Sequence, residues 1–307
     1  MFGVITIAHG PKRYIDMAIN MAISLKFHNP SIQCAIVTDV AQETVKEYFD
    51  YYIPIKSEYG LGLNQKLYLH EYSPFEETLF IDADCLVVKP LTGYYSLCIE
   101  HDFVILGSQI NSGEWYMDVS AMCKRFNVSD IPLFNGGTYY FKKGAITNRV
   151  YADAIKMIDN YQQLGFAPFR GGINEEPLVS VSMALNGIKA VEDPGFGMST
   201  PIGIVGVLEI DCLLGKSFFN KQGENVNPSI VHFCGAFANG FHYKREVVKL
   251  RLIRKFPFLK PLLISLVVNS YKNAYYASLV FVKRVAKRIL RKEKFDFNTI
   301  LPVYSNH

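Results

Sequence analysis

Two aspartates, Asp82 and Asp84, directly follow the apolar run 79–81. Carboxylates at the exit of a buried strand are costly unless a positive charge compensates them. Residues i and i+2 of an extended segment point to the same side, so both carboxylates can converge on one hard cation, Mn²⁺ or Mg²⁺. Such a cation can neutralise a diphosphate leaving group. A pair of acids that cap a helix or face water is the alternative, and the apolar residues on both sides of the pair favour the cation.

The elements in front of this pair alternate between strand and helix patterns. Apolar runs predict strands at 2–7, 34–37 and 52–55, and apolar residues at three- and four-residue spacing predict helices at 14–27 and 42–49. This order predicts an α/β fold with a doubly wound, mostly parallel sheet and helices on both faces. Ligands of such folds bind beyond the carboxyl ends of the strands. The residues at that rim are Thr6, His9, Gly10 and Asp39.

The pattern continues to about residue 243. Helices are expected at 64–70, 147–163 and 175–186, and strands at 102–107, 134–141 (after a turn) and 229–233.

Several polar residues of this region have two interpretations each. Lys66 can hold phosphate charge from the side opposite the cation, or it can be a solvated helix lysine. Asn135, followed by two glycines that allow close approach, can contact sugar hydroxyls or form an ordinary β-turn. Glu175 and Glu176 begin a predicted helix, where one can stabilise the helix N-terminus and the other can reach a sugar or acceptor. The sequence does not say which acid does which.

Three segments resemble motifs of the family 8 glycosyltransferases, the glycogenin-like and galactosyltransferase-like enzymes. Leu79–Val87 is similar to their Asp-x-Asp strand, Phe134–Gly137 to their Asn-small-Gly segment under the donor sugar, and His232–Gly235 to their His-aromatic-x-Gly motif. The segments occur in the family's order between residues 2 and 243. The resemblance implies a GT-A fold and a metal-dependent transfer of a hexose from a nucleotide diphosphate sugar to a hydroxyl, with retention of anomeric configuration.

The resemblance also implies roles for individual residues. Asp82, Asp84 and His232 would ligate the metal, and an imidazole beside two carboxylates suits Mn²⁺ better than Ca²⁺. Without the aspartates, His232 would be interpreted as a core histidine bonded to backbone. The residues expected to bind the donor, a UDP-sugar, are Thr6, His9, Asp39, Lys66, Asp82, Ala83, Asp84, Gly136, Gly137 and Gly235. The residues expected at the reacting sugar are Asn135, Glu175 and Glu176.

The chain departs from the family at one motif. The family follows its His-x-x-Gly segment with Lys-Pro-Trp, whose lysine binds diphosphate, whereas residues 236–240 here read Ala-Phe-Ala-Asn-Gly. The nearest cations are His242, Lys244 and Arg245. Either these residues substitute for the lysine or the diphosphate is held differently.

The charge distribution separates a body from a tail. The whole chain has a net charge of +4, but residues 244–294 hold fifteen Lys or Arg against two Glu. That segment therefore carries +13 and the remainder −9. The sequence predicts a catalytic domain at 1–245 and a basic helical extension at 246–307. The six scattered cysteines have no CxxC spacing and are expected to be reduced, buried residues of a cytosolic protein.

The extension has the pattern of a membrane-surface helix. Phe258–Val268 is apolar but too short to cross a bilayer, and Ala274–Lys294 places basic residues opposite aliphatic ones. The interpretation is a peripheral membrane protein on the cytosolic face that contacts anionic lipid and acts on a membrane-anchored glycan or glycolipid. A solvated helix packed on the acidic body is the alternative. No nucleic-acid-binding motif accompanies the charge.

Two other functions stay open at this point. A sugar nucleotidylyltransferase uses a related sheet, but its Gly-rich, Arg-containing loop after the first strand is replaced here by residues 8–13, Ala-His-Gly-Pro-Lys-Arg. A non-catalytic membrane-associated scaffold would keep the fold without the activity.

Overall fold

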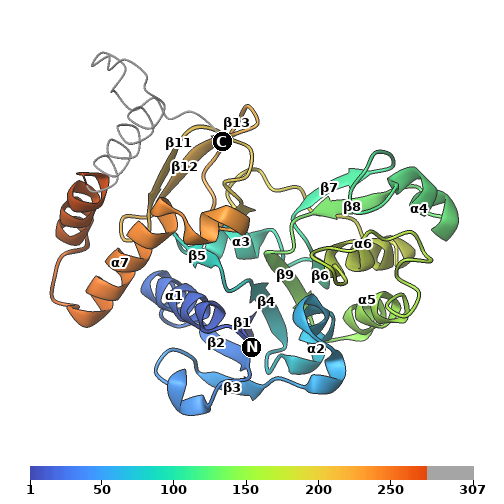
Figure 1. Ribbon diagram of the computed structural model, residues 1–307, viewed down its shortest axis with the longest axis horizontal. Helices are drawn as coiled ribbons and strands as arrows, with labels where there is room; N and C mark the ends of the chain where they lie inside the picture. The colour runs from blue at the N-terminus through green and yellow to red at the C-terminus, as the bar shows by residue number, and fades with distance from the viewer. Residues whose placement is uncertain (275–307) are drawn as a thin grey trace, which may run out of the picture.

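The computed structural model describes residues 1–274 of the chain. Its centre is a six-stranded sheet with the order β3-β2-β1-β4-β9-β6 (Figure 1). The strands are β1 (Phe2–Ile7), β2 (Gln33–Thr38), β3 (Tyr51–Pro54), β4 (Glu77–Ile81), β6 (Phe103–Val104) and β9 (Thr138–Lys142). The expected strands at 2–7, 34–37 and 52–55 are therefore confirmed to within two residues. The strand expected at 102–107 divides into β6 and β7 (Gly107–Ile110), and β7 pairs with β8 (Ile131–Phe134).

The sheet is parallel on one side of β4 and antiparallel on the other. β1 pairs in parallel with β2 and β4, and β2 with β3, whereas β9 runs antiparallel to β4 and β6. Because β9 is reversed, its first residue lies beside the last residue of β4, with Thr138 opposite Ile81. The segment that precedes β9 therefore meets the residues that follow β4.

Helices cover both faces of the sheet, as the alternation of strands and helices predicted. Successive strand residues divide between two cores: Val4 and Leu79 pack on the side of α1 (Lys12–His28), and Ile5 and Phe80 on the side of α5 and α6. α6 spans Glu175–Leu185, close to its expected bounds. α5 spans Ala145–Lys156, so the helix expected to reach residue 163 ends earlier.

Two expected helices are shorter and tighter than predicted. Residues 42–49 form only a 3₁₀ turn, Gln42–Thr44, and Val45 and Phe49 are their only buried apolar residues. A short helix with so little buried surface gains little from packing. Residues 64–70 belong to a 3₁₀ segment, Gly62–Tyr68, that runs into the short helix α2 (Leu69–Tyr72).

Two small sheets complete the body. β5 (Cys85–Val87) pairs antiparallel with β14 (Ile230–His232), with His232 opposite Cys85, and β10 (Met198–Ser199) lies on the other side of β14. β11 (Ile204–Asp211), β12 (Lys216–Lys221) and β13 (Glu224–Val226) form an antiparallel sheet that the sequence analysis did not anticipate. The shorter elements are α3 (Thr92–Ser96) and α4 (Val119–Phe126). All six cysteines are free, and only Cys234 is partly exposed.

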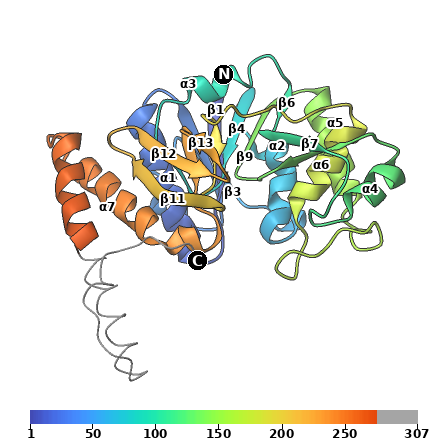
Figure 2. The same cartoon turned by 90° about the horizontal axis from the view of Figure 1, so that it is seen from above.

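The C-terminal part of the described chain packs on the body. α7 (Phe241–Lys255) contacts α1 and β11, and the boundary expected between residues 245 and 246 falls inside it. Residues 261–274 form a further helix that lies beyond α7 in both views (Figure 2). The basic segment expected at Ala274–Lys294 lies, except for Ala274, outside the described residues. Among residues 1–274, no helix combines the length and hydropathy that a bilayer crossing requires.

Candidate active site

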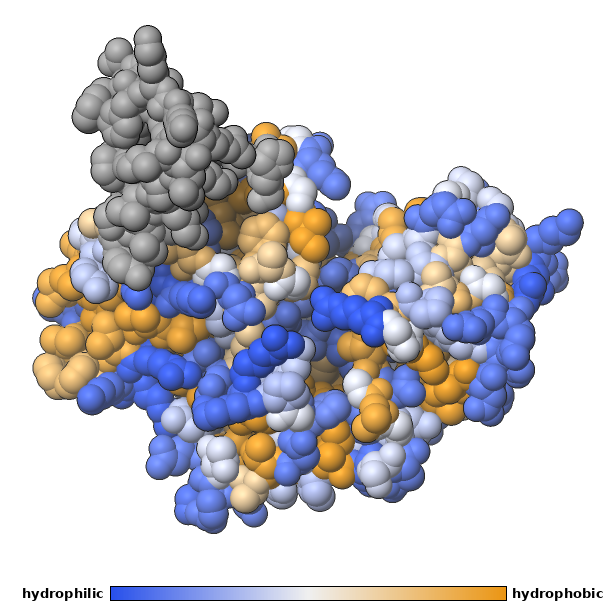
Figure 3. Space-filling model, viewed as in Figure 1, coloured by the Kyte–Doolittle hydropathy of each residue, from blue (hydrophilic) through white to orange (hydrophobic). Residues whose placement is uncertain are grey.

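A cleft of about 490 Å³ opens at the carboxyl end of β4. In the space-filling view the surface is indented between the half that carries α1 and α7 and the half that carries α4, α5 and α6 (Figure 3). Of the residues expected at the site, eight line the cleft: Lys66, Asp82, Asp84, Asn135, Glu175, Glu176, His232 and Gly235. Segments from five separate regions of the sequence therefore meet here.

Asp82 and Asp84 both line the cleft from a turn between β4 and β5, in which the amide of Cys85 donates to the carbonyl of Asp82 at 3.0 Å. Their side chains are 22% and 24% exposed, whereas Ala83 between them is buried. The amide of Asp82 donates to the carbonyl of Gly137 at 2.9 Å, and the carbonyl of Asp84 accepts from Phe233 at 3.0 Å. The antiparallel neighbours of β4 and β5 thus fix the turn, which replaces the extended segment expected at 82–84, and the convergence of the two carboxylates on one cation stays a prediction.

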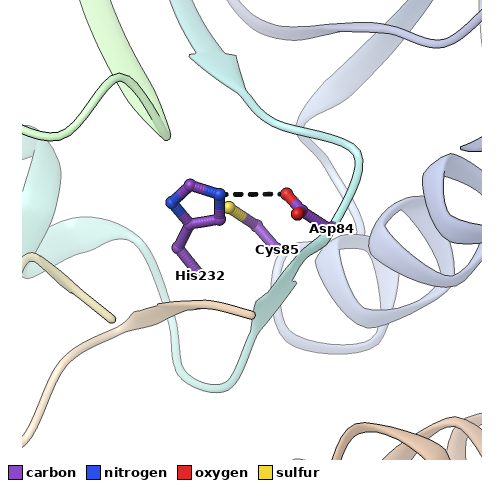
Figure 4. A group of neighbouring side chains, drawn as sticks. All are labelled: Asp84, Cys85 and His232. Atoms are coloured by element: carbon purple, nitrogen blue, oxygen red, sulfur yellow. Dashed lines mark ion pairs between the residues drawn. The ribbon is translucent and has the colours of Figure 1, made fainter. Parts of the chain in front are cut away.

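His232 faces the two aspartates with a defined ring orientation. Its Nδ1 atom lies 2.6 Å from Oδ1 of Asn135, a carbonyl oxygen, so Nδ1–H donates and Nε2 faces Asp84 at 3.0 Å (Figure 4). The same Nε2 atom is 3.8 Å from Oδ2 of Asp82. Burial lowers the pKa of His232, but its hydrogen bond to Asp84 and the charges of both aspartates outweigh this effect and raise it. The carbonyl oxygen of Asn135 is therefore occupied in orienting the ring.

The donor atoms fit a hard divalent cation. Neighbouring ligands of an octahedral Mg²⁺ or Mn²⁺ lie about 3 Å apart, close to the separation of Asp84 Oδ1 and His232 Nε2. The group whose donor atoms all lie within 4.8 Å of one another is Asp84, Cys85 and His232 (Figure 4). A thiol must lose its proton to ligate, and burial raises the pKa of Cys85 well above its ordinary value, so this cysteine is disfavoured. Asp82 lies outside this group, and its Oδ2 atom contacts Lys66, but its carboxylate is chemically the more suitable third ligand for a hard cation.

Lys66 is not a solvated helix lysine. It is 7% exposed, and its Nζ atom contacts Oδ2 of Asp82 at 2.8 Å, Oε1 of Glu175 at 3.1 Å and the carbonyl of Gly136 at 3.2 Å. Burial lowers the pKa of Lys66, but the charges of Asp82 and Glu175 reverse the effect and raise it. Lys66 is therefore charged and sits beneath the cleft, between two carboxylates.

Glu175 and Glu176 have different surroundings. The cap of α6 is the side chain of Asn174, which accepts from the amide of Glu176 at 3.3 Å, so neither acid is the cap. Glu175 is 2% exposed, and its Oε2 atom has no hydrogen-bond partner among the described residues. Glu176 accepts from the amide of Gly136 at 2.6 Å, and burial, followed by the charge of Glu175, raises its pKa to about 7.

Gly137 is required because nothing larger fits beside His232. A Cβ atom at this position would overlap Nδ1 of His232 and come within 3.1 Å of Oδ1 of Asn135. We expect Gly137→Ala to displace the imidazole and to lower turnover at least tenfold, since small misplacements of a catalytic group have large effects. Gly93→Ala in α3 is the matched control, because its Cβ would meet only Phe196 at an ordinary contact distance of 3.4 Å. Equal rates for the two variants would contradict the expectation.

The residues expected to read the nucleotide lie apart from the cleft. Thr6, His9 and Asp39 are not among the described residues that line it. Thr6 is fully buried and its hydroxyl has no partner among residues 1–274, whereas Asp39 accepts from the amide of Gly10 at 2.9 Å. Asp39 and His9 do lie at the carboxyl ends of β2 and β1, where the doubly wound sheet places a ligand. Their roles stay predictions.

The three cations proposed to replace the family's lysine do not reach the cleft. Arg245 is buried and donates to Glu246 at 2.8 Å and to the carbonyl of Ile210 at 2.6 Å. Burial, with the charges of Arg245 and Lys249, lowers the pKa of His242 to about 4 and leaves it neutral. In the described part of the chain, His242, Lys244 and Arg245 are all absent from the lining of the cleft.

Two arginines that the sequence analysis did not single out line the cleft instead. Arg13 lies in the first turn of α1, and Arg170 precedes α6 on the opposite side. Neither forms an ion pair with any of residues 1–274. Arg170 was detectable in principle, because Arg-Gly-Gly between two helices indicates a tight turn. Arg13 carries no comparable signal, since a lysine or arginine in a first turn is usually solvated.

Comparison with known proteins identifies the fold. No family model and no curated protein sequence matches the chain. The galactosyltransferase LgtC, crystallised with donor and acceptor sugar analogues, aligns over 81% of this chain and 95% of LgtC, with 13% identity and a TM-score of 0.53. An active-site mutant of LgtC aligns over 82% and 95%, with 13% identity and a TM-score of 0.51. A protein described as a glucose-1-phosphate thymidylyltransferase from Bacillus anthracis reaches only 0.39, which carries no argument for that alternative. The chain therefore has the GT-A glycosyltransferase fold of LgtC, as its resemblance to family 8 predicted.

Proposed function

We propose that the chain is a metal-dependent glycosyltransferase that moves a hexose from a nucleotide diphosphate sugar to a hydroxyl group. The observation that carries the proposal is the arrangement of Asp82, Asp84 and His232, with Nε2 of His232 at 3.0 and 3.8 Å from the two carboxylates. It lies at the carboxyl end of a central strand, beside a cleft large enough for a sugar and its diphosphate.

Each residue around the pair has a part in this reaction. A divalent cation held by Asp82, Asp84 and His232 would supply positive charge for the departing diphosphate. Asn135 orients His232, and Lys66 holds Asp82 and Glu175 in place. The free Oε2 atom of Glu175 and the carboxylate of Glu176 offer acceptors for sugar hydroxyls. Arg13 supplies the cation that the family's lysine would otherwise give to the diphosphate.

A screen for donor hydrolysis tests the proposal. The purified chain is incubated with UDP-, GDP- and ADP-sugars, with Mn²⁺ and with chelator, and release of nucleotide diphosphate is measured. We expect one UDP-hexose to be hydrolysed with Mn²⁺ and not with chelator. Release of a nucleoside triphosphate from nucleotide sugar and pyrophosphate would indicate a nucleotidylyltransferase, and no turnover of any donor would indicate a scaffold. Transfer with retention is expected, and the anomeric configuration of the product by NMR checks it.

We further propose that the enzyme acts at the cytosolic surface of an anionic membrane, on a membrane-anchored glycan or glycolipid. The support is the helix of residues 261–274, which has two apolar sides. Ile264 and Val268 are buried against the body, whereas Leu262, Leu263 and Leu266 are more than half exposed. An exposed apolar helix face beside basic residues is the pattern of a surface-bound helix. In Figure 3 a hydrophobic area extends over this end of the molecule.

Vesicle flotation tests the membrane proposal with the full-length chain. Wild type should float with vesicles that contain phosphatidylserine and much less with phosphatidylcholine alone. The double variant Leu262→Glu, Leu266→Glu should lose most of this flotation, because both side chains are exposed. Glu substitution at the buried Val268 would damage the fold and is not a suitable control, so Asn273→Gln, at an exposed and uncharged position of the same helix, is used. Flotation of the double variant equal to that of wild type would contradict the proposal.

A further inference from the structure

Arg170 is presented to the cleft by a tight hairpin. Phe169 and Gly172 exchange two backbone hydrogen bonds, of 2.9 and 3.0 Å, so that Arg170 and Gly171 are the two residues of the turn. Their φ angles are +51° and +79°. Positive φ at both central positions defines a type I′ turn, in which Asn-Gly and Gly-Gly are preferred.

Arginine is an unfavourable residue for the first of these positions. A side chain with a Cβ atom is strained in the left-handed region, and asparagine tolerates it better. Such strain persists at sites where the side chain has a function, and an observed outlier is a reason to look for one. The long cationic side chain of Arg170 is therefore the feature to explain.

The charge of Arg170 is balanced by no carboxylate of the described residues. Its guanidinium lies over the ring of Phe169, 4.9 Å from the centroid, and forms no ion pair with residues 1–274. The two nearby acids are engaged elsewhere, Glu175 with Lys66 and Glu176 with the amide of Gly136. Arg170 is exposed and lines the cleft.

Arg170 lies beside two aromatic rings, Tyr116 and Phe169, and these three residues form a platform that is fixed to the rest of the domain. The amide of Ala167 donates to the carbonyl of Tyr116 at 2.7 Å, which joins the hairpin to the loop that carries Tyr116. The rings of Tyr116 and Phe169 meet edge to face at 5.5 Å, and both line the cleft. Aromatic faces with one cationic group beside them suit a sugar ring that bears a negative charge.

The position of this platform assigns it to the acceptor. Arg170 and Tyr116 come from the segments before α6 and α4, in the half of the molecule that carries α4 to α6 (Figure 1). The nucleotide end of the donor belongs at the carboxyl ends of β1 and β2, in the other half. The cation ligands lie between them. What remains on the side of Arg170 is the space that the attacking molecule must occupy.

We propose that Arg170 selects an anionic acceptor, a sugar that carries a carboxylate or phosphate group. The inference rests on the proposed glycosyltransferase function and adds the charge of its acceptor. The guanidinium would form a bidentate, charge-assisted hydrogen bond with the anionic group, while the sugar ring packs on Tyr116 and Phe169.

The test uses pairs of glycosides that differ only in charge. Methyl glucuronide is compared with methyl glucoside, and methyl galacturonide with methyl galactoside, as acceptors that accelerate donor consumption. Wild type should prefer the acidic member of at least one pair about tenfold or more in kcat/KM. Arg170→Asn should reduce that ratio to about one through KM, and Arg170→Lys should keep part of it. Donor hydrolysis without acceptor should change less than twofold in either variant.

The melting temperature of Arg170→Asn distinguishes a role in acceptor binding from a structural role in the turn. Asparagine suits the turn better than arginine, so Arg170→Asn should melt at the same temperature as wild type or higher. A preference that survives Arg170→Asn, or no preference in wild type, would overturn the proposal. An increase in the donor KM of Arg170→Asn would also overturn it, because the arginine would then serve the diphosphate.

A binding measurement decides the matter even where no donor is turned over. Saturation-transfer NMR of the acidic glycosides with wild type and Arg170→Asn reports acceptor binding directly. Absence of donor hydrolysis would count against the proposed function, whereas equal binding of acidic and neutral glycosides would count against the role of Arg170.

Discussion

Asp84→Asn should reduce metal-dependent donor hydrolysis at least about 10³-fold, because the charge that a bound cation provides to a leaving group is worth several kcal/mol. The substitution keeps the size of the side chain but removes the negative charge that faces Nε2 of His232 at 3.0 Å. We expect the loss in turnover to be accompanied by weaker Mn²⁺ binding, measured by calorimetry or by the signal of free Mn²⁺ in electron paramagnetic resonance.

Cys85→Ala, at the neighbouring residue, is the matched control for Asp84→Asn. Cys85 belongs to the same group of donor atoms, yet its buried thiol donates weakly to the carbonyl of Gly137, with 3.8 Å between the two atoms. Cys85→Ala should therefore leave Mn²⁺ affinity within about threefold of wild type, and thermal melting of both variants shows whether they are folded. Retention of more than a tenth of the activity by Asp84→Asn would count against the metal site. Equal losses of Mn²⁺ affinity in both variants would instead make the cysteine a ligand.

Lys249→Met should lower the free energy of unfolding by about 3–5 kcal/mol, since it leaves the buried carboxylate of Asp211 without its cation and leaves Glu246 with Arg245 alone. Lys249 is fully buried in α7, and its Nζ atom contacts Asp211 at 2.7 Å and Glu246 at 2.9 Å. Asp211 also accepts from Ser265 and Asn269 of the helix at 261–274. Removal of the lysine therefore weakens the attachment of both C-terminal helices to the end of β11. Urea denaturation at neutral pH measures the change.

Lys244→Met is the matched control for this prediction. Lys244 lies on the same helix but is exposed, so its replacement should change the free energy of unfolding by no more than about 0.5 kcal/mol. Neutralising the carboxylate that has lost its cation, with Asp211→Asn, should recover part of the loss, because the cost comes from unpaired buried charge. A loss below about 1 kcal/mol for Lys249→Met would mean that water reaches the two acids.

The burial of Lys249 shows that the net charge of a sequence segment does not give the charge that the segment exposes. Residues 244–294 are strongly basic in sequence, but Arg245 and Lys249 are neutralised inside the protein by Glu246 and Asp211. Asp211 lies 38 residues before Lys249, so no local pattern connects them. Burial of charge depends on which segments pack together, and a sum along the chain does not contain that information.

The position of Asp82 and Asp84 at a strand end, in contrast, follows from residues close to them in the sequence. The buried strand before them follows from the apolar run, which is a local property. The sequence alone therefore placed two carboxylates at a strand end, whereas the turn from Asp82 to Cys85 sets their orientation. The opening β1, α1 and β2 were predictable for the same reason, because their hydrophobic periods lie within single elements.

The sequence thus predicts the elements at the start of the chain, the paired carboxylates and the motif order that indicates a GT-A fold. The partners of those carboxylates depend on tertiary packing. The antiparallel return of β9 brings Gly137 to Asp82, and the pairing of β14 with β5 brings His232 to Asp84. The 3₁₀ segment at 62–68 buries Lys66 against Asp82 and Glu175. The hydrogen bond between Ala167 and Tyr116, which attaches the hairpin of Arg170 to another loop, is a fact of the same kind. Local conformation is set by neighbouring residues, whereas each of these contacts joins residues far apart in the chain and exists only when the layers are packed.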